Sequence, residues 1–89
     1  MQFEWDREKA SANFKTHRVS FDEAATIFYD PLAATFEDRD HSTREHRFLT
    51  IGCSSKGRLL VVSHTERSNA LRIISARLAS AKERKRHES

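Results

Sequence analysis

The spacing of apolar residues in the first third of the chain is typical of a helix. Phe21, Ala24, Ala25 and Phe28 occupy positions i, i+3, i+4 and i+7, which places them in one apolar stripe. A Ser-x-x-Glu capping box precedes the stripe, and the Asp-Pro pair at 30–31 ends it, because a residue before proline avoids the helical region. We therefore expect an amphipathic helix that packs its apolar stripe against the rest of the fold.

The segment before this helix predicts another one. Asp6 is suited to cap a helix over 7–17, in which Ala10 and Phe14 lie four residues apart on one face. Residues 3–6 can begin as a short extended segment. Two helices in succession are thus expected near the start of the chain.

Short apolar runs separated by turn residues predict strands in the remainder. The expected strands are 32–36, 47–54, 58–66 and 71–77, separated by a polar loop at 37–46 and by turns at 55–57 and 67–70. A last helix over 79–88 begins with a second capping box, Ser80 and Glu83. Helices grouped before an antiparallel meander predict an α+β fold of about four strands, with the N-terminal helices covering one face and a short C-terminal helix.

Composition narrows the class of protein. The 89 residues are expected to form a single domain over 1–89, with 37% hydrophobic residues and six Phe to build a core. Cys53 is the single cysteine, so no intramolecular disulfide can form. The sequence contains neither the roughly 18 consecutive apolar residues of a membrane span nor a secretory signal. We therefore expect a cytoplasmic protein.

Charge is divided unevenly along the chain. Residues 1–40 carry five Lys/Arg and nine Asp/Glu, a net charge of −4, whereas residues 41–89 carry eleven and four, a net charge of +7. A basic region of this size commonly faces a polyanion such as nucleic acid, or an acidic protein partner. A merely solvated basic surface is the alternative.

Alternation along the last two strands brings polar residues toward one edge of the sheet. His64 and Glu66 share a face of the third strand, whereas Arg72 and Arg77 fall on opposite faces of the fourth. Because a short turn joins these strands, we expect His64, Glu66 and Arg67 to lie near Arg72. Arg77 lies at the far end of its strand, near the start of the last helix.

These residue types match the needs of RNA cleavage. A base must take the 2′-hydroxyl proton, an acid must protonate the leaving 5′-oxygen, and cations must stabilise charge on the phosphate. His64 is the candidate general acid or base, because an imidazole titrates near neutral pH. Glu66 would orient His64 or carry the second proton, and Arg67, Arg72 and Arg77 would contact the phosphate. A purely structural pair of His64 and Glu66 is the alternative.

Further basic residues are candidate RNA contacts. Lys15 and His17 end the first helix, where cations also suit the helix dipole, and Lys82 and Arg84 belong to the basic last helix, which can equally be a solvated face. The five histidines lie on separate elements without an H-x-x-x-H pair, so neither a metal site nor a cofactor is expected.

Several blocks of the sequence together resemble one family. "FEWDREKASANFKTHRVSFDEAATIFYDP" is similar to the opening of the BrnT toxins of bacterial toxin–antitoxin pairs, with its F-x-W-D start and its V-S-F-x-E-A segment. "RFLTIGCSSKGRLLVVSHTER" and "LRIISARLASAKERK" resemble the family's later blocks, L-x-V-V-x-H-T-x-R and R-I-I-S-A-R-x-A-x-x-x-E-R. Arg18 stands where a glycine often follows the family's histidine, so we expect a less tight turn there.

The resemblance implies a RelE-like fold and an RNA-cleaving toxin that stops translation and growth. It also implies neutralisation by a BrnA-type antitoxin with a DNA-binding domain, in a heterotetramer that represses its own promoter. His64, Thr65 and Arg67 match the family's H-T-x-R, Arg72 and Arg77 match R-I-I-S-A-R, and Glu83 matches the acidic position of the last helix.

Three hypotheses follow from the sequence. The first is an endoribonuclease that needs no metal, because side chains alone can promote attack by a 2′-hydroxyl. The second is a non-catalytic basic module that binds an antitoxin or nucleic acid. The third is a DNA-binding regulator acting alone, which the sequence disfavours because no helix pair shows a recognition-helix pattern.

Overall fold

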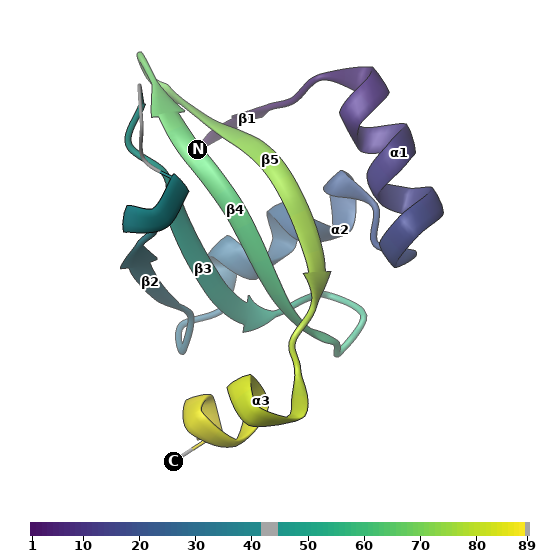
Figure 1. Ribbon diagram of the computed structural model, residues 1–89, viewed down its shortest axis with the longest axis vertical. Coiled ribbons are helices and arrows are strands. Elements are labelled where there is room, and N and C mark those ends of the chain that lie inside the picture. Colours follow the sequence, from purple (N-terminus) through teal and green to yellow (C-terminus); the bar gives the residue numbers. More distant parts are fainter. Residues whose placement is uncertain (42–44, 89) are drawn as a thin grey trace.

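A single sheet with helices packed against it makes up the computed structural model, which describes residues 1–41 and 45–88 (Figure 1). In chain order its elements are β1 (Gln2–Glu4), α1 (Arg7–His17), α2 (Phe21–Thr26), the 3-10 helix η1 (Ile27–Tyr29), β2 (Ala34–Glu37), the 3-10 helix η2 (Arg39–His41), β3 (Phe48–Cys53), β4 (Leu59–Arg67), β5 (Ala70–Leu78) and α3 (Ala81–Glu88). The first helix has its predicted bounds, and the four predicted strands are present within two residues of their expected ends.

The sheet is mixed, with strand order β1-β5-β4-β3-β2. β2 to β5 form the expected antiparallel meander, but β1 adds a fifth strand that runs parallel to β5, with Phe3 opposite Leu71. The prediction of four purely antiparallel strands is therefore wrong, because a strand of three residues is too short for alternation to reveal it. The α+β class is confirmed, whereas the RelE-like architecture stays a prediction.

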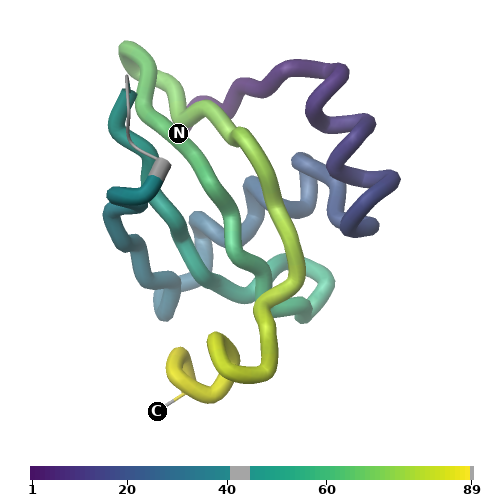
Figure 2. The backbone as a smooth tube through the Cα atoms, viewed as in Figure 1, coloured from purple at the N-terminus to yellow at the C-terminus, as the bar shows by residue number. Residues whose placement is uncertain are grey.

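The main core lies between the helices and one face of the sheet, called here the inner face. Figures 1 and 2 show the segment that contains α2 passing behind the sheet, with α1 beside β5. The buried core residues are Val19, Phe21, Ala24, Ile27, Leu60, Val62, Leu71, Ile73 and Ala76. The opposite face, called the outer face, carries a smaller cluster of Ile51, Leu59 and Val61. Most of the apolar surface is thus buried behind the sheet, and the outer face is left for other contacts.

A β-bulge interrupts the pairing of β4 with β5. Ser63 pairs with Ser75, but the next residue of β4, His64, pairs with Ile73, so Ile74 is an extra residue in β5. An extra residue shifts the phase of side-chain alternation along a strand. Residues of β5 on the two sides of the bulge therefore do not follow one strict period of two.

Both predicted capping boxes form at least in part. Ser20 Oγ accepts a hydrogen bond from the Glu23 amide (3.0 Å), and Ser80 Oγ accepts one from the Glu83 amide (3.1 Å). Only in the second box does the carboxylate return the bond, accepting from the Ser80 amide at 2.8 Å. Glu23 uses its carboxylate elsewhere.

The turn after α1 closes tightly without glycine. Arg18 has a φ of 57° and a ψ of 32°, in the left-handed region that favours glycine, and its amide donates to the Phe14 carbonyl at 2.9 Å. The expectation of a looser turn is therefore wrong, because an arginine backbone can adopt this conformation at a modest energetic cost.

A buried ion pair ties α2 to the hairpin between β3 and β4. The Glu23 side chain is 2% exposed and accepts hydrogen bonds from Arg58 Nε (2.9 Å) and Ser54 Oγ (2.7 Å). The Arg58 guanidinium holds the pKa of the Glu23 carboxyl below its usual value. This contact fixes the helical layer against the sheet.

We expect the Arg58→Ala variant to be markedly less stable than the wild type. It leaves the buried Glu23 carboxylate without its cation, which is expected to cost about 1–3 kcal/mol of unfolding free energy. Urea unfolding measures the loss, and the double variant with Glu23→Gln should recover part of it. A single variant within about 0.5 kcal/mol of wild type would show that the pair contributes little.

Candidate functional site on the outer face

His64 lies on the inner face, inside the core. The residue is 4% exposed, and its ring sits edge-on to Phe28 and stacked on Phe48, with centroids 5.0 and 5.8 Å away. Its Nε2 shares a 2.7 Å hydrogen bond with Thr50 Oγ1, which in turn bonds Thr35 Oγ1 at 2.7 Å. Among the described residues, Nδ1 has no hydrogen-bond partner. The imidazole is thus enclosed by aromatic rings and one hydroxyl.

Burial lowers the pKa of His64 from 6.5 to about 4, so the ring is neutral at physiological pH. Arg72 pairs with Thr65, the residue after His64, and therefore points to the outer face. The expected juxtaposition of His64 with Arg72 is wrong for this reason. A catalytic role for His64 stays a prediction, and its enclosure does not favour contact with RNA.

The buried imidazole predicts a pH dependence of stability. The unfolded chain binds a proton at His64 near pH 6.5, but the folded protein does so only near pH 4, so the stabilisation is complete above pH 6.5 and declines below it. We expect a loss of about 2 kcal/mol of unfolding free energy by about pH 5. The His64→Gln variant should lose this part of the pH dependence in urea unfolding, while a His46→Gln variant at an exposed position should keep it. Equal pH slopes in wild type and His64→Gln would contradict the assignment.

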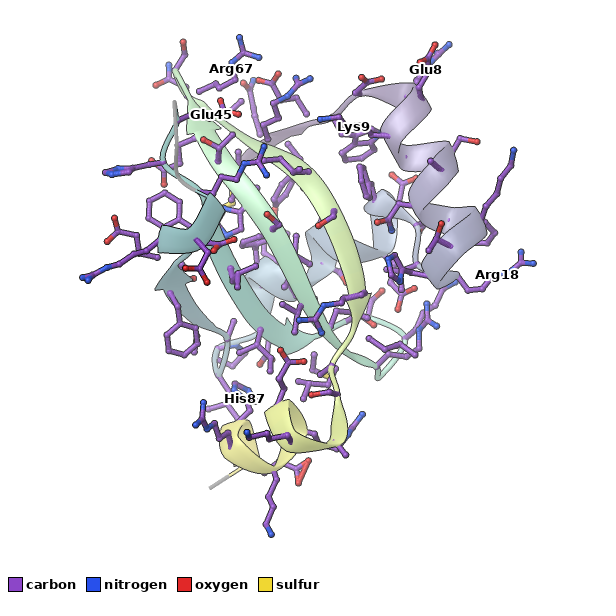
Figure 3. All side chains as sticks on the ribbon, in the orientation of Figure 1. Glu8, Lys9, Arg18, Glu45, Arg67 and His87 are labelled. Carbon is purple, nitrogen blue, oxygen red and sulfur yellow. The ribbon has the colours of Figure 1, made fainter. Side chains whose placement is uncertain are left out.

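The other residues predicted near His64 lie at the end of β4. Glu66 is exposed and lines a shallow pocket with Met1 and Asn69, on the side of the strand that His64 also faces. Arg67 is exposed at the last position of β4, at the end of the sheet away from α3, and Figure 3 shows it opposite His87. His64 instead contacts Thr50, Phe28 and Phe48, so the predicted cluster is dispersed.

The bulge brings two arginines to the same face. Arg72 pairs with Thr65, and Arg77 pairs with Val61, two positions that share the outer face of β4. The prediction that they point to opposite faces is therefore wrong, because it assumed unbroken alternation. Arg72 donates a 2.9 Å hydrogen bond to Glu4 Oε2 of β1. A line of basic groups thus follows β5 on the outer face.

Arg77 and Glu83 form the best-defined charged pair on this face. Arg77 donates from Nη1 to Glu83 Oε1 (2.7 Å) and from Nη2 to Oε2 (2.9 Å), and the two side chains are 42% and 35% exposed. The Arg77 guanidinium, helped by the Ser80 amide, lowers the pKa of Glu83 to about 2, and the same contact raises the pKa of Arg77. The pair is therefore ionised, oriented and open to solvent.

A groove runs beside this pair, between the outer face and α3, with a volume of about 520 Å³. The residues that line it are Ala34, Phe36, Leu49, Ile51, Val61, Glu83, Arg86 and His87. Sequence reasoning did not assign Phe36, Arg86 or His87 to a site. The basic cluster of the last helix was a signal for Arg86 and His87. No sequence pattern indicated that this helix lies against the apolar residues of the outer face.

The predicted RNA contacts outside the sheet occupy two separate places. Lys15 and His17 are exposed in the last turn of α1, on the helical side of the molecule, away from the outer-face groove. Lys82 and Arg84 are exposed on α3, where Arg84 lies 3.8 Å from Glu88. Lys82 and Arg84 thus flank Glu83 on α3, next to the Arg77–Glu83 pair. Lys15 and His17 lie apart from that pair, on α1.

Residues 1–41 and 45–88 hold neither a cluster of metal-binding side chains nor a membrane-spanning helix. No three His, Cys, Asp or Glu side chains gather there as metal ligands would. None of the helices there has the length and apolar character needed to cross a bilayer.

Comparisons with known proteins give a family and a similar structure. A family model described as "Ribonuclease toxin, BrnT, of type II toxin-antitoxin system" matches residues 5–83. The crystal structure of the Brucella abortus ribonuclease toxin BrnT is similar to this chain, with a TM-score of 0.71 and 24% sequence identity over 90% of this chain and 97% of that chain. At this identity the structural likeness shows a shared fold. The comparison with curated proteins finds no match.

Proposed function

The chain belongs to the BrnT family of ribonuclease toxins of type II toxin–antitoxin systems, and from this premise we propose that it is an endoribonuclease that cuts RNA on the outer face of its sheet. The observation that carries the choice of site is the doubly bonded pair of Arg77 and Glu83, half-exposed beside the groove. A guanidinium fork that fits two carboxylate oxygens also fits two phosphate oxygens. The pair therefore supplies a phosphate ligand and a carboxylate base at one place.

The proposed reaction is an internal transesterification. Glu83 takes the proton of the 2′-hydroxyl, the 2′-oxygen attacks the phosphorus, and the bond to the 5′-oxygen breaks. His87, which lines the groove, gives a proton to the leaving oxygen. The products are a 2′,3′-cyclic phosphate and a 5′-hydroxyl. Arg77 and Glu83 lie within residues 5–83, which the family model matches, and His87 lies outside that range.

Binding of RNA activates the base in this proposal. When a phosphate takes the Arg77 guanidinium, Glu83 loses the partner that holds its pKa at about 2. The carboxylate then gains proton affinity where the 2′-hydroxyl proton must be removed. Arg77 meanwhile stabilises the charge that develops on the phosphate oxygens.

The remaining basic residues hold the rest of the RNA. Arg67 and Arg72 on the sheet, with Lys82 and Arg84 on α3, contact phosphates on either side of the cleaved bond. Arg67, Lys82 and Arg84 are exposed, and Arg72 lies on the outer face, which supports this role. Glu66, which the sequence offered as a proton carrier, faces away from that track. Contacts from Lys15 and His17 would require RNA to pass around β5 to α1.

The same side chains account for cleavage without a metal. Attack by a neighbouring 2′-hydroxyl needs a base, an acid and phosphate neutralisation, and Glu83, His87 and Arg77 provide one of each. The reaction takes place in the cytoplasm, where cellular RNA is the substrate. We expect activity to persist in excess EDTA.

Neutralisation requires a protein partner, because the family is one of type II toxin–antitoxin systems. The proposed partner is a BrnA-type antitoxin that covers the outer face, in a heterotetramer that contacts promoter DNA through the antitoxin. The basic half of the chain supports a partner segment that is acidic.

Inducible expression tests the proposed function directly. Expression of the chain alone should arrest growth and deplete total RNA, and coexpression of the antitoxin encoded beside it should relieve both effects. Expression of the Arg77→Gln variant should neither arrest growth nor deplete total RNA. Growth arrest without RNA loss, or normal growth with the wild type, would favour a non-catalytic interaction module instead.

A further inference from the structure

The groove on the outer face combines two kinds of surface. Its floor is apolar and comes from three adjacent strands, with Leu49 and Ile51 of β3 between neighbours from β2 and β4. Phe36 of β2 stands at its side and is 59% exposed, although it is a large aromatic residue. Arg86 and His87 of α3 line the same groove. The groove thus combines an aromatic and aliphatic surface with a cationic one.

This combination fits the chemistry of a nucleotide. An unstacked nucleobase presents a flat apolar surface that stacks on aromatic side chains, and the phosphate attached to it is anionic. In single-stranded RNA both parts occur within one residue of the chain. A groove lined by both an exposed phenyl ring and a guanidinium can take both at once.

We propose that this groove is a nucleobase pocket that holds the unstacked base next to the cleaved phosphate; this inference rests on the proposed function of the Arg77–Glu83 pair. The two features are continuous, because Val61 on the floor pairs directly with Arg77 across the strands. Glu83 is both a lining residue and the partner of Arg77. A base in the groove therefore positions its own phosphate at the pair.

Charge on the wall favours an anionic occupant, and RNA is the anion that the proposed reaction brings to this face. Helix α3 carries four Lys/Arg against two Glu, and one of those carboxylates is neutralised by Arg77 of β5. Among the α3 residues that line the groove, Glu83 is paired with Arg77, so Arg86 gives this wall a positive charge. A polyanion with apolar faces satisfies both surfaces, whereas a purely apolar side chain leaves Arg86 without a partner.

Binding of uncleavable oligonucleotides tests the pocket separately from cleavage. Short labelled strands with 2′-deoxyribose at every position cannot react, and a matched set carries one abasic site at successive positions. Fluorescence anisotropy with the full-length protein should show that one abasic position weakens binding about tenfold. The Phe36→Ala variant should bind the intact strand about tenfold more weakly and should lose the sensitivity to the abasic site.

Two further variants test whether the effect depends on the groove itself. Ala34→Leu fills the floor of the groove while the Phe36 side chain is retained, and it should produce the same loss. Leu32→Ala removes a residue that is 76% exposed and does not line the groove, and it should bind as the wild type does. Circular dichroism and urea unfolding confirm that the variants are folded.

The possible outcomes distinguish failure of the pocket proposal from failure of the proposed cleavage reaction. Wild-type-like binding and abasic sensitivity in both Phe36→Ala and Ala34→Leu would overturn the pocket, even if the protein cleaves RNA normally. Unchanged RNA binding with weakened antitoxin binding in the same variants would also overturn it, and would assign the groove to the protein partner. Base-dependent binding by a wild type that does not cleave the matching RNA would support the pocket while refuting the proposed reaction.

Discussion

Replacing Arg77 with glutamine is expected to slow RNA cleavage by about 100- to 1,000-fold, the usual effect of removing one preorganised donor from a developing anion. Glutamine is shorter than arginine and uncharged, so it supplies neither the positive charge nor the two-pronged fork. The loss should fall mainly on kcat, because the contact strengthens as charge develops on the phosphate. Steady-state cleavage of a short fluorescent oligonucleotide measures it.

Two control variants show whether the loss of activity is specific to the Arg77 guanidinium. Arg77→Lys keeps the charge without the fork and should lie between the wild type and Arg77→Gln. Arg7→Gln removes an exposed arginine at the start of α1 and should leave the rate unchanged. If Arg77→Gln cleaves within a factor of about three of the wild type, the reaction centre lies elsewhere on the protein.

The Glu83→Gln variant is expected to lose about 100-fold or more in kcat, because general-base catalysis typically contributes 10²- to 10⁴-fold. The pH profile of the wild type should identify the same group. In the free protein the pKa of Glu83 is about 2, so its ionisation should leave no acidic limb in kcat/KM above about pH 4. In the complex the phosphate takes Arg77, the pKa of Glu83 rises, and kcat should fall between about pH 6 and pH 4.5.

Two results would contradict this role of Glu83. Parallel acidic limbs in kcat and kcat/KM would show that RNA does not separate the pair. Full activity in Glu83→Gln, with a large loss in His64→Gln at neutral pH, would return the proton transfer to the buried imidazole. Unfolding measurements at each pH distinguish a catalytic limb from the stability loss expected from His64.

The sequence predicted most of the architecture because local patterns determine it. Asp6 caps α1, Ser80 and Glu83 cap α3 reciprocally, and Gly57 adopts a positive φ of 77° in the turn between β3 and β4. The sequence predicted only a short extended segment at 3–6; its place in the sheet escaped prediction because it depends on pairing with β5, 68 residues further along the chain. Such a nonlocal contact leaves no periodic signal.

The site was harder to predict because one extra residue reorganises it. The bulge at Ile74 places Arg72 and Arg77 on one face, and strict alternation cannot reveal such an insertion. His64 was correctly placed on the same face as Leu60, but that face proved to be the buried one. Helical hairpins cover one side of a sheet, and the sequence did not indicate which. The chemistry-bearing residues were recognised individually, whereas their grouping depended on this choice.

The ends of the RNA products test the central claim most directly. Purified protein is incubated with a defined oligoribonucleotide in excess EDTA, and the masses of the fragments are measured by mass spectrometry. The account predicts fragments that end in a 2′,3′-cyclic phosphate and begin with a 5′-hydroxyl, and it predicts that they vanish with Arg77→Gln. Fragments that begin with a 5′-phosphate, or cleavage that stops when EDTA is added, would contradict it.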